Sequence, residues 1–173
     1  GNSQAIQTLL NNGADINART SKGMTALMQA AREGNSQAIQ TLLDNGADIN
    51  ARSNNGRTAL MFAASNRGHS QAIQTLLNNG ADIHARTNKS GTALMYAAIG
   101  GDSQAIQTLL NNGADIHARG YNGMTVLMFA AIAGNSQAVQ TLLDNKADIH
   151  AQDNNGGTAL MYARSGKHVD VVR

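Results

Sequence analysis

Cysteine is absent from this chain of 173 residues, and aromatic residues make up only 3% of it. Without cysteine, the chain has no disulfides, no thiolate metal site and no cysteine nucleophile. Its hydrophobic residues are mainly Ala, Leu, Ile and Met, which predict many thin layers rather than one large core. No apolar run approaches the roughly 18 residues of a membrane span, so we expect no membrane contact.

Catalytic motifs are also lacking. The sequence has no HExxH zinc motif, no nucleophile elbow and no glycine-rich dinucleotide loop. Its formal charge of +2 is too small for overall charge to indicate nucleic-acid binding. We therefore expect a protein that is not an enzyme and that holds no cofactor and no metal ion.

What the sequence does contain is repetition. Equivalent threonines are 33, 34, 33 and 33 residues apart, at Thr25, Thr58, Thr92, Thr125 and Thr158. A repeat of this length predicts one solenoid domain over residues 1–173. The domain would comprise a partial repeat at 1–12, full units at 13–45, 46–79, 80–112 and 113–145, and a truncated unit at 146–173. The extra residue of the 34-residue unit falls in a turn between helices, after Ala64.

Each unit combines a turn-rich finger with two short helices. Asn45-Gly46 ends a helix, because glycine accepts the left-handed conformation of a helix C-cap. Asn55-Gly56 predicts a tight reversal at the finger tip, and the Thr58 hydroxyl is expected to cap the helix that follows. In the third finger Ser90 precedes Gly91, whereas the other fingers place glycine first, so we expect a different turn there.

These units resemble ankyrin repeats. The family pattern, D-x-x-G-x-T-P-L-H-x-A-A-x-x-G-H and then L-L-x-x-G-A-D-x-N-A, stands here as GMTALMQAAREGNSQAIQTLLDNGADINA over residues 23–51. Similar copies cover essentially the whole chain. TALM replaces the family's TPLH, and we expect the methionines to fill the space of the missing histidines. The resemblance implies an all-α ankyrin repeat solenoid of stacked helix-turn-helix units with β-hairpin fingers.

The ends of the chain carry apolar residues where a solenoid usually has polar caps. Ile6, Leu9 and Leu10 begin the chain, and Val169, Val171 and Val172 end it. This pattern predicts either a fragment of a longer array or end-to-end self-stacking through the uncapped termini.

Variation among the units indicates where a partner could bind. The second helices all read SQAIQTLL or nearly so, whereas the finger tips and the ends of the first helices differ. By resemblance, those variable positions face the concave groove with which ankyrin repeats bind other proteins. The alternative explanation is that turns change more readily than packed helices.

We therefore predict a protein–protein interaction scaffold whose concave face is formed by the finger tips and first helices. The predicted partner-binding residues are Lys22, Met24, Asn54, Asn55, Arg57, Phe62, Asn88, Lys89, Tyr96, Tyr121, Met124, Phe129, Ile132, Asn154 and Tyr162. The fourth unit holds the most apolar part of this surface, so its Tyr121, Met124, Phe129 and Ile132 are the expected hot spot.

Two other functions remain open. The near-identical units and uncapped ends suit a spacer or self-stacking solenoid without a dedicated ligand. The basic residues of the fingers suit a polyanion or nucleic acid. An arginine column at Arg19, Arg52, Arg86 and Arg119 is expected either to pair with aspartates at Asp15, Asp48, Asp82 and Asp115 or to reach an anionic partner.

A histidine column replaces the asparagines of the first two fingers, at His84, His117 and His150. Stacked helices lie about 8–10 Å apart, whereas each nitrogen that binds zinc lies about 2 Å from it. One ion is therefore not easily shared between units, and we predict a structural hydrogen-bonding role for these histidines.

Overall fold

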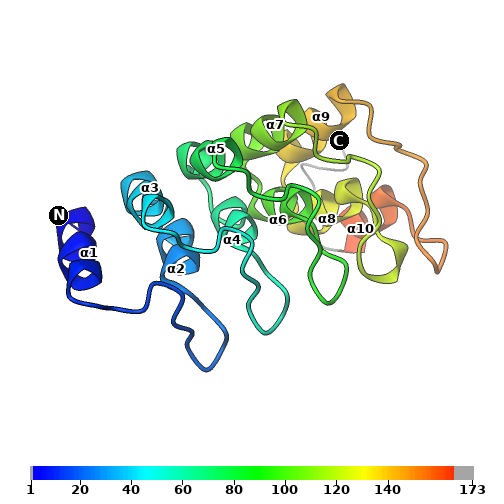
Figure 1. The fold of residues 1–173 in the computed structure, drawn as a ribbon. Coiled ribbons are helices and arrows are strands. Elements are labelled where there is room, and N and C mark those ends of the chain that lie inside the picture. Colours follow the sequence, from blue (N-terminus) through cyan, green and yellow to red (C-terminus); the bar gives the residue numbers. More distant parts are fainter. Residues whose placement is uncertain (1, 166–173) are drawn as a thin grey trace.

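The computed structural model, which describes residues 2–165, is a solenoid of short helices (Figure 1). Every regular element in this range is a helix, which confirms the predicted all-α fold but not its β-hairpin fingers. The elements are α1 (Asn2–Asn11), α2 (Ala26–Arg32), α3 (Ser36–Asp44), α4 (Ala59–Ala64), α5 (Ser70–Asn78), α6 (Ala93–Gly100), α7 (Ser103–Asn111), η1 (Tyr121–Gly123), α8 (Val126–Ala133), α9 (Ser136–Asp144) and α10 (Ala159–Ser165). None of these helices has both the length and the hydropathy needed to cross a membrane.

The helices form two rows, and the fingers project from one side of them (Figure 1). The first helices of the units, α2, α4, α6, α8 and α10, contact one another in that order, as do the second helices α1, α3, α5, α7 and α9. Within each unit the first helix also packs on the second, for example α4 on α5. No helix is long enough to be stable alone, so each unit depends on its neighbours.

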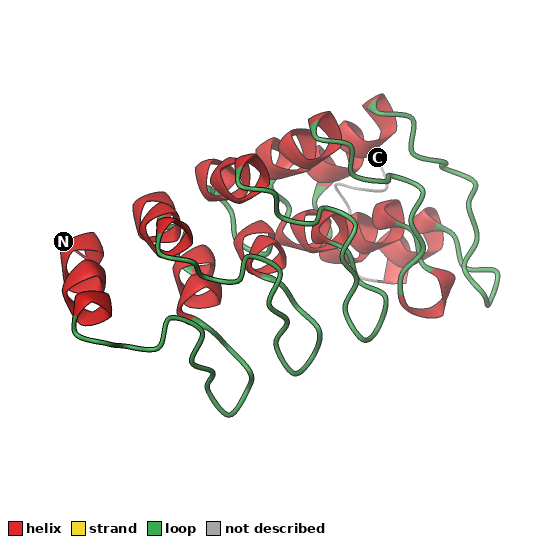
Figure 2. Cartoon of the chain, viewed as in Figure 1, coloured by secondary structure: helices red, strands yellow, loops and turns green. Residues whose placement is uncertain are grey.

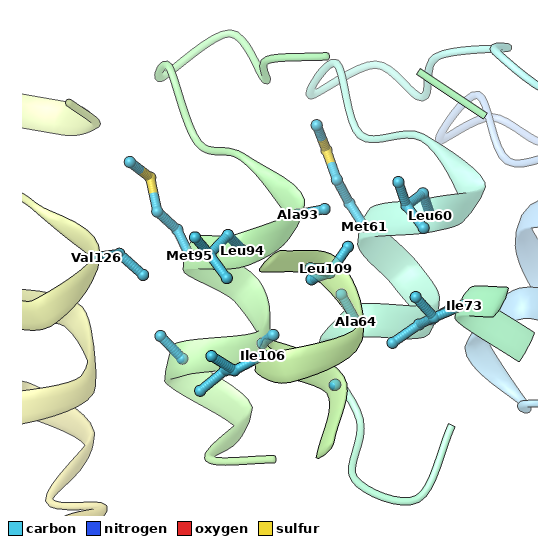
Figure 3. Close-up of a cluster of buried hydrophobic side chains, with 14 of the residues drawn as sticks. Leu60, Met61, Ala64, Ile73, Ala93, Leu94, Met95, Ile106, Leu109 and Val126 are labelled. Carbon is cyan, nitrogen blue, oxygen red and sulfur yellow. The ribbon is translucent and has the colours of Figure 1, made fainter. Parts of the chain in front are cut away.

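The core lies between the two rows and runs the length of the solenoid. All six residues of α4 are buried, and Ala63 and Ala64 are completely so, which lets neighbouring helices approach closely. Figure 3 shows Met61 and Met95 at equivalent places in successive layers. Met28, Met61, Met95 and Met128 are each at most 2% exposed. Met161, in α10, is 59% exposed.

The second helices bury one face and use the other to join units. In α5, Ala72, Ile73 and Leu76 are fully buried. On the outer face, Asn79 Nδ2 donates to Gln40 Oε1 of the preceding unit over 3.1 Å. The equivalent bonds join Asn45 to Gln7 and Asn145 to Gln107. These hydrogen bonds between units explain why the outer glutamines recur along the chain.

The fingers are loops, apart from the short 3-10 helix η1 in the fourth, and none of the described ones contains a strand (Figure 2). In the second finger the Gly56 N–H donates to Ser53 O over 2.8 Å, and the Ser53 N–H donates to Arg57 O over 2.9 Å. Gly56 has a φ of +79°, which glycine adopts without strain. A single ladder bond closes the loop, so the expected β-hairpins are tight turns instead.

The third finger turns as the first, second and fifth do, so the prediction of a different turn there was wrong. The Ser90 N–H donates to Thr87 O, and the Thr87 N–H donates to Gly91 O, both over 2.9 Å. Ser90 has a φ of +61° and thus takes the left-handed place that glycine holds in the other fingers. This conformation costs a non-glycine residue about 1–2 kcal/mol, a cost that the shared turn geometry outweighs.

Thr58 precedes α4 as predicted, but its hydroxyl makes no capping bond. Thr25, Thr92 and Thr125 do cap their helices, each accepting from a methionine N–H three residues ahead. Thr58 Oγ1 is buried and has no hydrogen-bond partner within residues 2–165. Thr58 therefore occupies the predicted N-cap position, but the predicted capping hydrogen bond is absent.

The predicted stacking surfaces are described only in part. Leu9 of α1 is 62% exposed. Val169, Val171 and Val172 lie outside the described residues. End-to-end stacking therefore remains a prediction.

Candidate functional site

The predicted partner-binding residues fall into three groups by burial. The exposed ones are Lys22, Asn54, Asn55, Asn88, Lys89, Tyr121, Ile132 and Asn154. The half-buried ones are Met24, Arg57, Tyr96, Phe129 and Tyr162. Phe62 and Met124 are only 9% and 8% exposed, and both belong to the core. Phe62 and Met124 are therefore not suited to contact a partner, because burial leaves their side chains little accessible surface.

Most finger tips are joined to one another by asparagines. The Asn54 N–H donates to Lys22 O over 3.1 Å, and Asn54 Nδ2 donates to Ser21 O over 2.9 Å. Asn88 repeats both bonds, to Asn55 O and Asn54 O. These asparagines, expected to contact a partner, thus connect neighbouring fingers.

One junction lacks this connection. Tyr121 stands in the fourth finger where Asn54 and Asn88 stand in theirs, and its N–H makes no bond to Lys89 O. The bond resumes in the next pair of fingers, where the Asn154 N–H donates to Asn122 O over 3.0 Å. Within the described chain, the third and fourth fingers are therefore the pair whose tips are not hydrogen-bonded.

A pocket of about 210 Å³ lies at this junction. Its lining includes four predicted residues, Lys89, Tyr96, Tyr121 and Phe129. Sequence reasoning missed the other four, Thr87, Gly91, Met95 and Ile99. Only Lys89 among the eight is charged, so the pocket is a mainly apolar cleft with one cation in its lining.

Large apolar side chains are exposed around this pocket. Tyr121 is 64% exposed, Ile99 is 49% exposed, and Ile132 of the neighbouring first helix is 41% exposed. The Lys89 ammonium lies 5.9 Å from the centroid of the Tyr121 ring, within the range of a weak cation–π contact. The hot spot expected in the fourth unit stays a prediction; of its residues, Tyr121 and Phe129 line the pocket, whereas Met124 is buried.

The guanidinium of Arg57 is surrounded by groups of the chain itself and is not free to contact a partner. Its guanidinium lies 4.2 Å from the centroid of the Phe62 ring and 4.3 Å from that of Tyr96. The same group donates to Met61 O over 3.3 Å and to Ser65 Oγ. Burial lowers the pKa of Arg57 from its ordinary value. The charge is held between two rings, which leaves Lys22 and Lys89 as the exposed cations of the described finger tips.

Tyr162 is likewise engaged within the chain. Its hydroxyl donates to Asp153 Oδ2, while Asp153 Oδ1 accepts from the Gly157 and Asn155 N–H groups over 2.8 and 2.9 Å. The tyrosine bond and these backbone bonds lower the pKa of Asp153. The same bond to Asp153 raises the pKa of Tyr162. This pair fastens the fifth finger to α10.

The arginine column does not pair with the aspartates in the described structure. Each guanidinium donates instead to the backbone carbonyl one unit ahead, as from Arg19 to Arg52 O over 2.6 Å and from Arg52 to Arg86 O over 2.7 Å. Each aspartate accepts from the backbone two residues on, as Asp48 Oδ1 does from the Asn50 N–H. The arginine column therefore does link successive units, but through backbone carbonyl groups and not through aspartates.

Among the described residues, a hydrogen bond between neighbouring fingers is also missing where the histidine column begins. Asn17 Oδ1 accepts from the Asp48 N–H and Asn50 Oδ1 from the Asp82 N–H, both over 3.0 Å. His84 makes no equivalent bond to Asp115, and a pocket of about 410 Å³ lies there. The predicted imidazole hydrogen bonds are absent from residues 2–165. No group of three or more acidic or histidine residues in that range is placed to hold a metal ion.

Comparison with known proteins places this architecture in a family. The family model for ankyrin repeats matches three times, at residues 1–87, 68–153 and 94–173. A search of curated proteins finds no match. The family matches agree with the resemblance seen in the TALM units and together span the chain. The chain therefore belongs to the ankyrin repeat family.

Proposed function

We propose that this chain binds a partner protein through the face formed by its finger tips and first helices, with the pocket between the third and fourth fingers at the centre. The observation that carries the proposal is the apolar pocket of about 210 Å³ beside the 64% exposed ring of Tyr121. Exposed aromatic residues next to apolar clefts are typical of binding hot spots.

The family supports a protein as the partner. Ankyrin repeats are generally protein–protein interaction modules, and the family is typically a non-enzymatic scaffold. The other face of the solenoid supports binding less well, because its outer Gln and Asn side chains bond to one another. The finger face offers apolar side chains without such partners.

A photo-cross-linking experiment tests the face. The photoreactive residue p-benzoylphenylalanine replaces Tyr121 or Asn55 on the finger face, and Gln71 or Gln104 on the second helices as controls. After irradiation in an extract of the source cells, we expect the same protein to be cross-linked from both finger positions and from neither control. Cross-links from the second helices alone, or equal labelling from all four positions, would contradict the proposal.

The polyanion alternative receives less support from the finger face. Its arginine column already donates to backbone carbonyls, and Arg57 is enclosed by rings. Lys22 and Lys89 of the finger tips and Arg32 and Arg164 of the first helices remain exposed. These four cations give a smaller salt dependence than the roughly six to ten phosphate contacts of a typical nucleic-acid binder. Self-stacking rests on the exposed Leu9 at one end of the solenoid and, within residues 2–165, has no pocket of its own to support it.

A further inference from the structure

The pocket corresponds to a place that the preceding unit fills with its own arginine. Arg57 occupies the space between Phe62 and Tyr96 and bonds to Met61 O and Ser65 Oγ. One unit further on, the equivalents of these four residues are Tyr96, Phe129, Met95 and Ile99. All four line the pocket.

The pocket exists because the equivalent of Arg57 is Gly91. The other finger residues at this place, Met24 and Met124, have long side chains that are half-buried or buried. Gly91 has no side chain to enter the space between Tyr96 and Phe129. The third finger thus leaves open a site that three other fingers close with their own side chains.

The lining decides which side chain suits the open site. In the Arg57 site, Ser65 supplies a hydroxyl acceptor, whereas Ile99 supplies only methyl and methylene groups. Lys89 also lines the pocket and would repel a guanidinium. An apolar cavity of roughly 150 Å³ holds a benzene ring, so about 210 Å³ accommodates one aromatic or branched aliphatic side chain.

The charge around the pocket indicates what flanks that side chain. The tips of the first four fingers, residues 20–24, 53–57, 87–91 and 120–124, contain three cations and no acidic residue. Lys89 is exposed and makes no hydrogen bond or ion pair with a protein group within residues 2–165. A carboxylate next to the apolar side chain would find a partner there.

We propose that the pocket binds an extended partner segment in which an aromatic or branched aliphatic side chain is flanked by acidic residues. The apolar side chain enters between Tyr96 and Phe129, and a neighbouring carboxylate pairs with the Lys89 ammonium. This inference rests on the proposed function and specifies the chemistry of its partner.

Peptide display provides the probe. Random dodecapeptides displayed on phage are selected on the intact chain at about 0.15 M ionic strength, where charges more than about 8 Å apart are screened. We expect enriched peptides to share an aromatic or branched aliphatic residue next to Asp or Glu. The best peptide is then synthesised with a fluorescent label, and its affinity is measured by anisotropy.

Two variants and their matched controls test the binding mode. Gly91→Arg fills the pocket as Arg57 fills its own site and should weaken the labelled peptide at least tenfold or so. Met24→Arg makes the same residue at the equivalent place of the first finger and should change affinity less than about twofold. Lys89→Glu should weaken binding about tenfold, whereas Lys22→Glu, at the same place in the first finger, should not. Thermal unfolding followed by circular dichroism shows whether each variant is folded.

Several results would overturn the inference. They are enrichment of basic peptides, peptides that bind the Gly91→Arg variant as tightly as the original, equal effects of the two lysine changes, or no enrichment at all. If Tyr121 still cross-links a partner in the extract, the proposed function survives such a failure. If the cross-linking fails as well, both proposals fall.

Discussion

Gly56 lies so close to Asn88 that a Cβ on Gly56 would be 2.6 Å from Asn88 Oδ1 and 2.9 Å from Asn88 N. The hydrogen bonds between the second and third fingers therefore require glycine at this place. Ser90, its equivalent in the third finger, does carry a Cβ. The next finger has Tyr121 instead of asparagine, and these two finger tips are not bonded. Ser90, Tyr121 and the left-handed Asn122 of the fourth finger, with its φ of +56°, thus all lie at the junction whose finger tips are not bonded.

Restoring both residues should close that junction. Ser90→Gly alone removes left-handed strain but makes the unfolded chain more flexible, so we expect little net change. Tyr121→Asn alone leaves the Ser90 Cβ in the way. The double variant regains two hydrogen bonds and should be more stable than the sum of the single changes by about 1 kcal/mol. Urea unfolding of the four proteins measures this coupling, and additive effects would contradict it.

The reverse change at the next finger is the control. A Cβ on Gly123 would lie 2.3 Å from Asn154 Oδ1, and Gly123 has a φ of +72°. Gly123→Ser should therefore destabilise the chain by about 1–2 kcal/mol. An unchanged urea midpoint would show that the spacing of the fingers adjusts freely.

Much of this architecture could be predicted because each unit repeats the same local signals. Threonine precedes each first helix, glycine follows most second helices, and Leu, Met and Ala recur on the buried faces. These signals act within a few residues, so they determine the helices of every unit. The family pattern then gives the stacking.

The pocket could not be predicted in the same way, because its lining comes from two neighbouring units. Gly91 and Ile99 are visible in the sequence only as variations at the tip and helix end. Their effect depends on Tyr96 and Phe129 standing on either side of the space that Arg57 fills one unit earlier. The sequence also misplaced Met124: this apolar finger residue was expected at the binding surface, but it packs into the core.

Thr58 provides a test of the missing helix cap. Its buried hydroxyl has no partner within residues 2–165, whereas the Thr92 hydroxyl accepts from the Met95 N–H. Valine keeps the shape of threonine and removes the hydroxyl. We expect Thr58→Val to be neutral or stabilising and Thr92→Val to cost about 1 kcal/mol. Equal losses in chemical denaturation would show that the Thr58 hydroxyl finds a partner in solution.

Asp102 joins the 34-residue unit to the one that follows. Its Oδ1 accepts from the Gln104 and Ala105 N–H groups, and its Oδ2 accepts from the Gly68 N–H over 2.7 Å. Asp102→Asn replaces one acceptor by a donor and should cost about 1–2 kcal/mol. Asn135→Asp, at the equivalent cap, should change stability by less than about 1 kcal/mol. Similar unfolding curves for both variants would contradict the role of Gly68.

The Asp153–Tyr162 bond should make stability depend on pH at both extremes. The lowered pKa of Asp153 gives a contribution that is complete above about pH 4 and is lost as pH falls through the folded-state value. The raised pKa of Tyr162 gives one that is complete below about pH 10 and is lost as pH rises through its folded-state value. Tyr162→Phe removes the tyrosine contribution and the part of the Asp153 contribution that comes from the tyrosine bond, while the bonds from the Gly157 and Asn155 N–H groups stay.

Urea midpoints of the original chain and of Tyr162→Phe, measured across pH, test this. The difference should be largest on a plateau between about pH 4 and 10 and shrink outside it. Tyr96→Phe is the control, because the Tyr96 hydroxyl has no hydrogen-bond partner within the described residues. Tyr96→Phe should not reproduce the loss at low pH, and a flat difference for Tyr162→Phe would contradict the bond.

Arg57 separates the contribution of its charge from that of its volume. Arg57→Ala removes the contacts with Phe62 and Tyr96 and leaves a cavity, so it should cost about 1–3 kcal/mol. Arg57→Met fills the space as Met24 and Met124 do in their own units. Because Arg57 Nε is buried without a hydrogen-bond partner in the described structure, methionine also removes an unsatisfied donor, and we expect a loss below about 1 kcal/mol. A loss for Arg57→Met as large as that for Arg57→Ala would show that the cation–π contacts, not the filling of the space, hold these two units together.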